Sequence, residues 1–227
     1  MLRRLAARPV AVFGVVALIG VGAVLVAKSS LTGWLPMGGF RVERERGLAP
    51  FTGLVVDGPF QVIVSEGDHA LRLEGPGDLL RYVTVARDGD DVVILFSGDG
   101  MAERTVTAII HGQAIARLRA RGAVRLEADG GLAKTLQVSA TGAASVVLKG
   151  SCEALALHLT QAARAKLDGF DCARVKARME HAASAVLRAR DRLEANVSGV
   201  AELRYHGSPR VLVTDTAAEG QVGPIVQ

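Results

Sequence analysis

The stretch Gly142-Ala-Ala-Ser-Val-Val-Leu-Lys-Gly150 decides the fold, because the chain repeats it with variation. It returns as Gln161-Ala-Ala-Arg-Ala-Lys-Leu-Asp-Gly169 and as His181-Ala-Ala-Ser-Ala-Val-Leu-Arg-Ala189. Related segments begin at Gly122 and Gly199, so that successive starts are 20, 19, 20 and 18 residues apart. Self-similarity at a fixed period of about 20 residues indicates a stacked repeat architecture.

A second set of apolar residues lies between these segments and alternates with polar residues. Strict alternation predicts a strand with one buried face. Each repeat therefore supplies two short strands and two turns, which make one coil of a β-solenoid, and stacked coils bury a continuous core. Equivalent residues should form columns with neighbours about 4.8 Å apart. The clearest predicted column contains Leu136, Leu155, Val175, Leu193 and Val211.

Two other folds compete with the solenoid. Regularly spaced strands are also typical of an antiparallel β-sandwich, but a sandwich does not require the same residue class every 20 residues. Residues 173–195 are rich in Ala and Arg and could form a helix, which would break the columns on both sides. We therefore predict an all-β, parallel β-solenoid (β-helix) of about 20-residue coils.

The N-terminus has the pattern of an export segment. Arg3, Arg4 and Arg8 precede the uncharged residues 9–27, and Lys28 ends that run. A basic head before an apolar run is typical of a cleaved signal peptide or of a retained transmembrane anchor. A buried helix of a soluble protein is the third reading. Both export readings place residues 30–227 outside the cytoplasm, in the periplasm or cell envelope, with a possible inner-membrane anchor.

The remaining chain divides by composition and by register. We expect a signal or anchor at residues 1–28, a linker at 29–43, and a C-terminal tail at 215–227. Residues 113–214 hold the repeat. Residues 44–112 contain strand-like runs without the 20-residue register, and we expect this head region to form an N-terminal β cap, since an open solenoid end is a template for aggregation.

A known family resembles this chain. Phe51-Thr-Gly-Leu-Val-Val-Asp-Gly-Pro-Phe-Gln-Val-Ile-Val-Ser-Glu-Gly-Asp68 and Leu71-Arg-Leu-Glu-Gly75 look like the opening of the "putative auto-transporter adhesin, head GIN domain" family. Thr141-Gly-Ala-Ala-Ser-Val-Val-Leu-Lys-Gly150 is similar to its coils, and the resemblance covers about residues 44–214. It implies a β-solenoid of the bacterial cell envelope with no catalytic residues. Gln161 and His181 replace the small residues usual at their turns, which should be less tight.

Composition excludes several functions. Without residues 1–27 the chain has 24 basic and 23 acidic residues, a net charge of +1, which gives no footprint for nucleic acid. The His and Cys residues lack metal-ligand spacing, so that no metal or cofactor is predicted. A glycosidase needs two carboxyl groups about 5–9.5 Å apart. The candidates are Asp168, Asp171, Glu180, Asp191 and Glu194, and the column of Asp168 with Lys149 and Arg188 favours a surface ion pair instead.

Two function hypotheses remain. The first is a non-catalytic envelope module, not an enzyme, that binds a glycan, a lipid surface or a protein. The second is a carbohydrate-active enzyme, a polysaccharide lyase or hydrolase built on a β-helix. The later coils are locally basic, which indicates either a solvated face or a contact patch for anionic glycan or lipid headgroups. That patch would consist of Arg164, Lys166, Arg174, Lys176, Arg188 and Arg204.

The two cysteines provide a test of the register. Cys152 and Cys172 are 20 residues apart, which is one full coil, so they should be stacked neighbours. Neighbours about 4.8 Å apart fall inside the Cα window for a disulfide, and an exported domain permits the bond. Alternatively, both are small buried residues of one column. The same register predicts that Leu157 points inward and His158 outward.

Overall fold

The computed structural model describes residues 41–98, 104–215 and 219–225, with the side chains of residues 46–98, 104–212 and 219–225. These residues belong to one compact unit, Gly38–Gln227. None of the helices within this described part has the length and apolarity to cross a membrane. The predicted export segment at residues 1–28 and most of the predicted linker lie outside the described residues.

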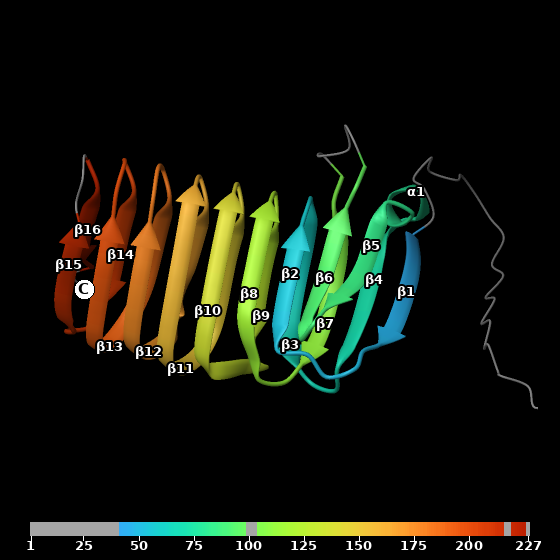
Figure 1. Cartoon of the computed structure of the whole chain (residues 1–227), viewed down its shortest axis with the longest axis horizontal. Helices are drawn as coiled ribbons and strands as arrows, with labels where there is room; N and C mark the ends of the chain where they lie inside the picture. The colour runs from blue at the N-terminus through green and yellow to red at the C-terminus, as the bar shows by residue number, and fades with distance from the viewer. Residues whose placement is uncertain (1–40, 99–103, 216–218, 226–227) are drawn as a thin grey trace, which may run out of the picture. The chain divides into compact units, whose positions relative to one another are not determined.

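The described chain is almost entirely β-structure (Figure 1). The first part contains β1 (Arg41–Gly47), β2 (Gly53–Asp57), β3 (Phe60–Glu66), β4 (Ala70–Pro76), the short helix α1 (Gly77–Leu80), β5 (Val83–Asp88), β6 (Asp91–Phe96) and β7 (Val106–Gly112). The second part contains β8 (Ile115–Gly122), β9 (Arg125–Asp129), β10 (Leu132–Gly142), β11 (Ser145–Gln161), β12 (Arg164–Met179), β13 (Ser184–Val197), β14 (Glu202–His206), β15 (Arg210–Asp215) and β16 (Gln221–Pro224).

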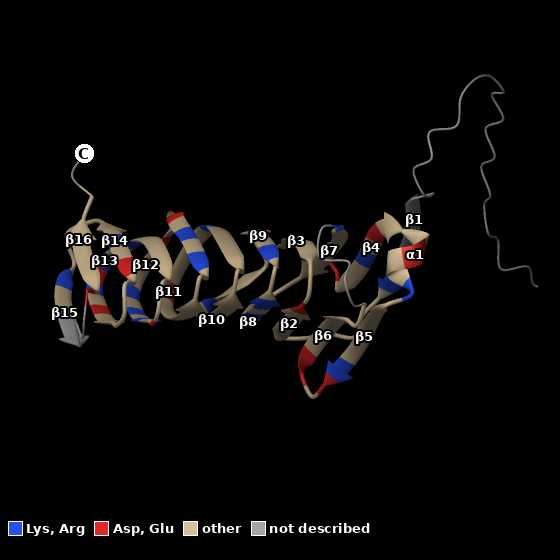
Figure 2. Ribbon diagram, turned by 90° about the horizontal axis from the view of Figure 1, so that it is seen from above, with Lys and Arg blue, Asp and Glu red and all other residues tan. Residues whose placement is uncertain are grey.

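Parallel pairing stacks these strands into two sheets that face each other (Figure 2). Sheet 1 contains β6, β2, β8, β10, the C-terminal halves of β11, β12 and β13, and β15. Sheet 2 contains β7, β3, β9, the N-terminal halves of β11, β12 and β13, then β14 and β16. Each coil contributes one strand to each sheet, which confirms the predicted parallel β-solenoid.

The core lies between the two sheets and is formed by their inward-pointing residues. The predicted column is confirmed: Leu136, Leu155, Val175, Leu193 and Val211 are paired in successive strands. Leu157 is 2% exposed whereas His158 is exposed, as the alternation predicts. The buried residues from Phe51 to Leu203 form a single cluster. Burial of one such Leu or Val contributes about 1.5–3 kcal/mol, so stacking supplies most of the stability.

The turns between the sheets repeat one backbone conformation. Gly122, Gly142 and Gly199 have φ of 77°, 86° and 77°, and the corresponding Gln161 and His181 have φ of 64° and 67°. The expected looser turns at Gln161 and His181 are therefore wrong, because these residues adopt the same left-handed conformation. A Cβ on Gly199 would lie 2.7 Å from the His181 carbonyl oxygen, so a larger residue at Gly199 would force the turn to shift. The left-handed region costs a residue with a Cβ about 1–2 kcal/mol.

The N-terminal coils stack in an order that differs from their order in the chain. β2 lies between β6 and β8 in sheet 1, and β3 lies between β7 and β9 in sheet 2 (Figure 1). Leu54 of β2 joins the column of Leu157 through Leu118 and Val138. Residues 44–112 therefore supply two parallel coils to the solenoid. The sequence predicts only a capping head region there. The 20-residue period is absent there because β4, α1 and β5 intervene.

Three strands of this region pair in the opposite direction. β4 is antiparallel to β7, β1 is antiparallel to β4, and β5 is antiparallel to β6. They continue both sheets beyond the β6–β7 coil. At the other end, β15 pairs only with β13 and β16 only with β14 within the described residues. The two ends of the solenoid are therefore different in kind.

Candidate binding surface

The six basic residues predicted to form one patch lie on two opposite surfaces. We call the outer surface of sheet 1 face 1 and that of sheet 2 face 2. Face 2 carries Arg164, Lys166, Arg188 and Arg204, whereas face 1 carries Arg174 and Lys176. The predicted patch is divided because β12 passes from sheet 2 into sheet 1 between Lys166 and Arg174. Figure 2 shows basic residues on strands of both sheets.

Face 1 contains two adjoining hollows, with volumes of about 420 and 300 Å³. They share Gln137, Ala156 and Lys176 among their lining residues. The floor lies on β10 and β11, where the outward side chains include the short Ser139, Ala154 and Ala156. Long basic side chains flank this floor on β8 and on β12. We call this depression the basic trough.

The wall on β8 consists of Arg117 and Arg119, which sequence reasoning missed. Both are held by Asp91 at the start of β6. The Asp91 Oδ1 atom accepts from Arg117 Nε at 3.0 Å and from Arg117 Nη2 at 2.7 Å, and Asp91 Oδ2 accepts from Arg119 Nη1 at 3.4 Å. The Asp91 side chain is only 14% exposed. A nearly buried carboxylate that binds both guanidinium groups holds them over β2, on the side of β8 away from β10.

Gly53 makes this contact possible. It lies on β2 directly between Asp91 and Arg117, paired with each of them. A Cβ on Gly53 would lie 1.8 Å from Asp91 Oδ1 and 3.1 Å from Arg117 Nε. The absence of a side chain therefore lets the carboxylate cross over β2 and reach the second strand away.

The wall on β12 consists of Arg174, Lys176 and Arg178, with Arg192 behind it on β13. Arg178 Nε donates to Glu180 at 2.7 Å. Glu194 lies 2.7 Å from Arg192 and 3.8 Å from Lys176. These pairs are exposed to solvent, so each contributes little to stability. Their main effect is to position the basic groups along the edge of the trough.

Face 2 contains a separate hollow of about 660 Å³, lined in part by Arg164, Lys166 and Asp168. The expected ion pair of Asp168 with Lys149 and Arg188 is not formed. Lys149 Nζ lies 3.8 Å from Asp129, and Arg188 Nε donates to the backbone carbonyl of Asp168 at 3.2 Å. The register shifts between β12 and β13 after Leu167, which moves Arg188 opposite Asp171.

Three of the five carboxylates considered for glycoside hydrolysis are engaged in ion pairs. Glu180 contacts Arg178, Glu194 contacts Arg192, and Asp171 Oδ2 lies 3.4 Å from Arg190 Nη1. The hydrogen bond from Arg178 lowers the pKa of Glu180, although desolvation raises it in part. A general acid needs a raised pKa to hold its proton near neutral pH, so Glu180 is suited to a surface pair.

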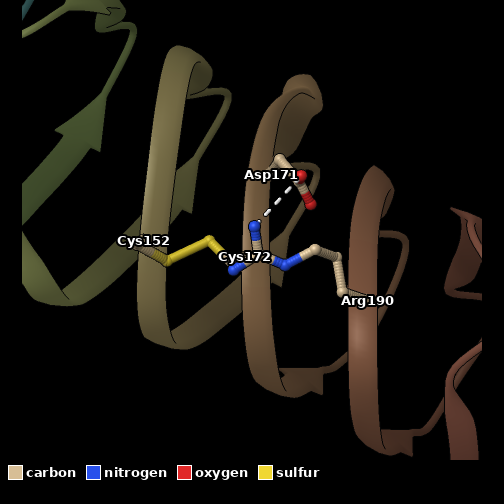
Figure 3. Close-up of a disulfide and its surroundings, with 4 residues drawn as sticks. All are labelled: Cys152, Asp171, Cys172 and Arg190. Atoms are coloured by element: carbon tan, nitrogen blue, oxygen red, sulfur yellow. Dashed lines mark hydrogen bonds and ion pairs between the residues drawn. A yellow bond between two sulfur atoms is a disulfide. The ribbon is translucent and has the colours of Figure 1, made fainter.

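Cys152 and Cys172 are paired residues of β11 and β12, and a disulfide joins them (Figure 3). Their Cα atoms are 4.5 Å apart. Both residues are buried, so the bond lies inside the core. Figure 3 also shows Asp171, next to Cys172, reaching Arg190 of the following coil. Three successive coils are thereby linked beyond their backbone hydrogen bonds.

Residues 50–209 match the family described as "Putative auto-transporter adhesin, head GIN domain". The chain belongs to this family. The match begins next to Phe51 and includes the crossed N-terminal coils, the basic trough and the disulfide. Both the wall on β8 and the wall on β12 therefore lie within the head GIN domain.

Solved structures share the fold of this head GIN domain. A "putative adhesin" from Bacteroides fragilis is 15% identical, with a TM-score of 0.66 over 83% of this chain and 98% of that one. A "putative adhesin" from Parabacteroides merdae is 14% identical, with a TM-score of 0.50 over 83% of this chain and 97% of that one. Comparison with curated proteins finds no match. At these identities the likeness establishes the fold alone.

Proposed function

We propose that this chain is a non-catalytic, adhesin-like module of the cell envelope that binds a partner through the outer faces of its solenoid. The observation that carries the proposal is the basic trough, a depression whose β12 wall carries three basic side chains and whose β8 wall is formed by two arginines bound to Asp91. Its acidic residues are paired with arginines and are not poised as free acids. The family description, which names an adhesin, supports the same kind of role.

The location follows from the same proposal. The family description suggests an exported protein of the cell surface. Residues 9–27 would carry the chain across the inner membrane, as a cleaved signal or as a retained anchor, and would leave the head GIN domain in the periplasm or envelope. A reporter that is active only outside the cytoplasm, fused after Gln227, should therefore be active. Activity of a cytoplasm-only reporter at the same position would contradict this location.

The antiparallel strands fit a capping role in this module. β1, β4 and β5 extend the sheets beyond the β6–β7 coil, and α1 adds the buried Leu79 and Leu80. The edge strand β1 is rich in charged residues, which disfavour the pairing of an exposed edge with another chain. We infer that this region protects the N-terminal end from end-to-end association.

The test separates binding from catalysis. The full chain, purified in nanodiscs of neutral phosphatidylcholine, is mixed in turn with the glycan, lipid and protein fractions of envelope extract. We expect retention of at least one fraction without new reducing ends or unsaturated sugar products. Failure to retain any fraction would contradict the binding role. Cleavage of the glycan fraction would instead support a carbohydrate-active enzyme.

A further inference from the structure

We propose that the basic trough binds a linear anionic glycan that lies along strands β10 and β11. The proposal rests on the binding role proposed above and names the ligand class and the site. It depends on the charge, the spacing and the chemistry of the groups that line the trough.

The charge of the trough is strongly positive although the domain as a whole is nearly neutral. Among the residues lining the two hollows, six are basic and one, Glu194, is acidic. Counting also Asp91 and Glu180, which bind wall residues from outside the lining, leaves six basic groups against three acidic ones, an excess of three. The six basic residues are Arg117, Arg119, Arg174, Lys176, Arg178 and Arg192.

The register sets the spacing of these cations. The pairing places Arg117, Gln137, Ala156 and Lys176 in one row across four strands, and Arg119, Ser139, His158 and Arg178 in the next. The two walls are thus three strand spacings apart, about 14 Å at about 4.8 Å per step. Along each wall, successive outward residues are about 6.6 Å apart. A chain lying along the strands would meet Arg174, Lys176 and Arg178 at regular intervals on the β12 side. On the other side it would meet the stems of Arg117 and Arg119, whose guanidinium groups reach over β2 to Asp91.

The floor supplies groups suited to sugar rings. Ala154 and Ala156 are apolar and can contact ring C–H groups. Gln137, Ser139 and His158 present amide, hydroxyl and imidazole groups that can donate to or accept from sugar hydroxyls. The combination of a few polar groups on a small floor with cations along the β12 side matches a glycan with carboxylate or phosphate substituents.

Two other polyanions fit less well. Single-stranded nucleic acid is bound through aromatic side chains that stack on the bases, and the lining of the trough contains no Phe, Tyr or Trp. A flat membrane surface would meet the tips of the basic side chains and leave the recessed floor without a contact. A lipid surface is therefore the alternative that the experiment must separate.

The experiment uses the full chain in nanodiscs of neutral phosphatidylcholine. The probe is fluorescent polygalacturonate, a linear polyanionic glycan, and binding is followed by anisotropy. Methyl-esterified polygalacturonate is the uncharged comparison, and vesicles of phosphatidylglycerol are the lipid comparison. We expect binding to the charged glycan, none to its ester, and no preferential capture by the vesicles.

Strand β12 offers a matched pair of charge variants. The double variant Arg174→Gln, Lys176→Gln removes two charges from face 1, and Arg164→Gln, Lys166→Gln removes two from face 2 of the same strand. The first should weaken binding about 5- to 30-fold, as expected for two partly exposed ionic contacts, and the second less than about twofold. All four side chains are exposed, so both variants should melt as the unmodified protein does.

A steric variant tests the trough without changing its charge. Ala156→Ile fills the floor, and it should weaken glycan binding at least about fivefold. Equal losses in the two charge variants, or full binding by Ala156→Ile, would overturn the trough as the site. So would preferential capture by the anionic vesicles, or absence of binding to polygalacturonate. In each of these cases retention of an envelope fraction would still support the binding module itself.

Discussion

The ordered coils, residues 132–206, and the crossed coils, β2–β3 with β6–β7, reach the same stacking in different ways. In the ordered coils each turn of the chain is placed directly on the one before it. In the crossed coils the chain leaves the stack after β3 and returns on the far side of β2. The comparison shows that columns of apolar residues determine which coils stack on each other. A regular period appears in the sequence only where the coils stack in the order of the chain.

The largest expected effect comes from two substitutions that test whether the ordered coils and the crossed coils unfold together. Leu157→Asp in the ordered coils and Val62→Asp in the crossed coils each bury an unpaired carboxylate among apolar residues. Each should cost about 3–5 kcal/mol and lower one single thermal transition, because both residues belong to one buried cluster. Calorimetry or circular dichroism measures the number and temperature of the thermal transitions.

The exposed neighbour His158 provides the control for this pair. The free energy of unfolding of His158→Asp should lie within about 0.5 kcal/mol of that of the unmodified protein. If Val62→Asp left a second transition at the original temperature, the crossed coils would be an independent folding unit, and the comparison between the two regions would lose its basis.

The disulfide gives the next largest effect and acts within the ordered coils alone. Closing a 20-residue separation contributes about 3 kcal/mol in the chain-entropy model. We expect Cys152→Ser, Cys172→Ser to lower stability by up to that amount. Mass spectrometry of alkylated, unreduced protein from the envelope should show no free thiol at either position. Two alkylated thiols would show that the bond is absent from the native protein.

Gly53 tests a contact that exists only because the coils are crossed. Gly53→Ala places a Cβ against the Asp91 carboxylate, so that Asp91 must release Arg117 or β2 must shift. We expect a loss of about 1–2 kcal/mol, measured by chemical denaturation. Gly223→Ala is the matched control, since a Cβ there has no neighbour within 4 Å. Equal stability of the two variants would mean that Asp91 is not held across β2.

The smallest expected effect concerns the turns of the ordered coils. Gln161 has a φ of 64°, and Gln161→Gly should stabilise the protein by about 0.5–1 kcal/mol by relieving the left-handed strain. The reverse change at the equivalent turn, Gly142→Ala, should destabilise it by about 1 kcal/mol or more. The midpoints of urea denaturation measure both effects, provided that the dependence of the unfolding free energy on urea concentration is unchanged. A stabilising Gly142→Ala would show that the turn conformation does not limit stability.

The sequence allowed the ordered coils to be predicted because each column recurs at a nearly constant offset. Leu155 and Val175 could be aligned by counting, and so could the two cysteines. The crossed coils could not be aligned in this way, although Leu54 and Val56 show the same apolar alternation as the later strands. Their partners lie at separations set by β4, α1 and β5, and nothing local specifies which strand a parallel strand will join.

The same limitation concealed half of the candidate site. The sequence identifies Arg174 and Lys176 as basic residues of the repeat. It also predicts that Arg164 and Lys166 belong to the other strand of the same coil, but it does not show that this strand lies on the opposite surface. Arg117 and Arg119 precede the clear repeats, and their partner Asp91 is joined to them only through the crossed order of β6, β2 and β8.

The bond between Cys152 and Cys172 has a mechanical consequence if the chain binds a partner as proposed. A pull on the C-terminal end would peel coils from the open end one at a time, because each coil contacts only its neighbours. When peeling reached Cys172, the load would pass through the sulfur atoms directly to β11. The residues between the two cysteines could then not be pulled into an extended chain. The bond therefore prevents an extension of about 65 Å, at about 3.3 Å per residue. Under tension, extension of the chain would therefore pause at the disulfide until the next coil unfolds.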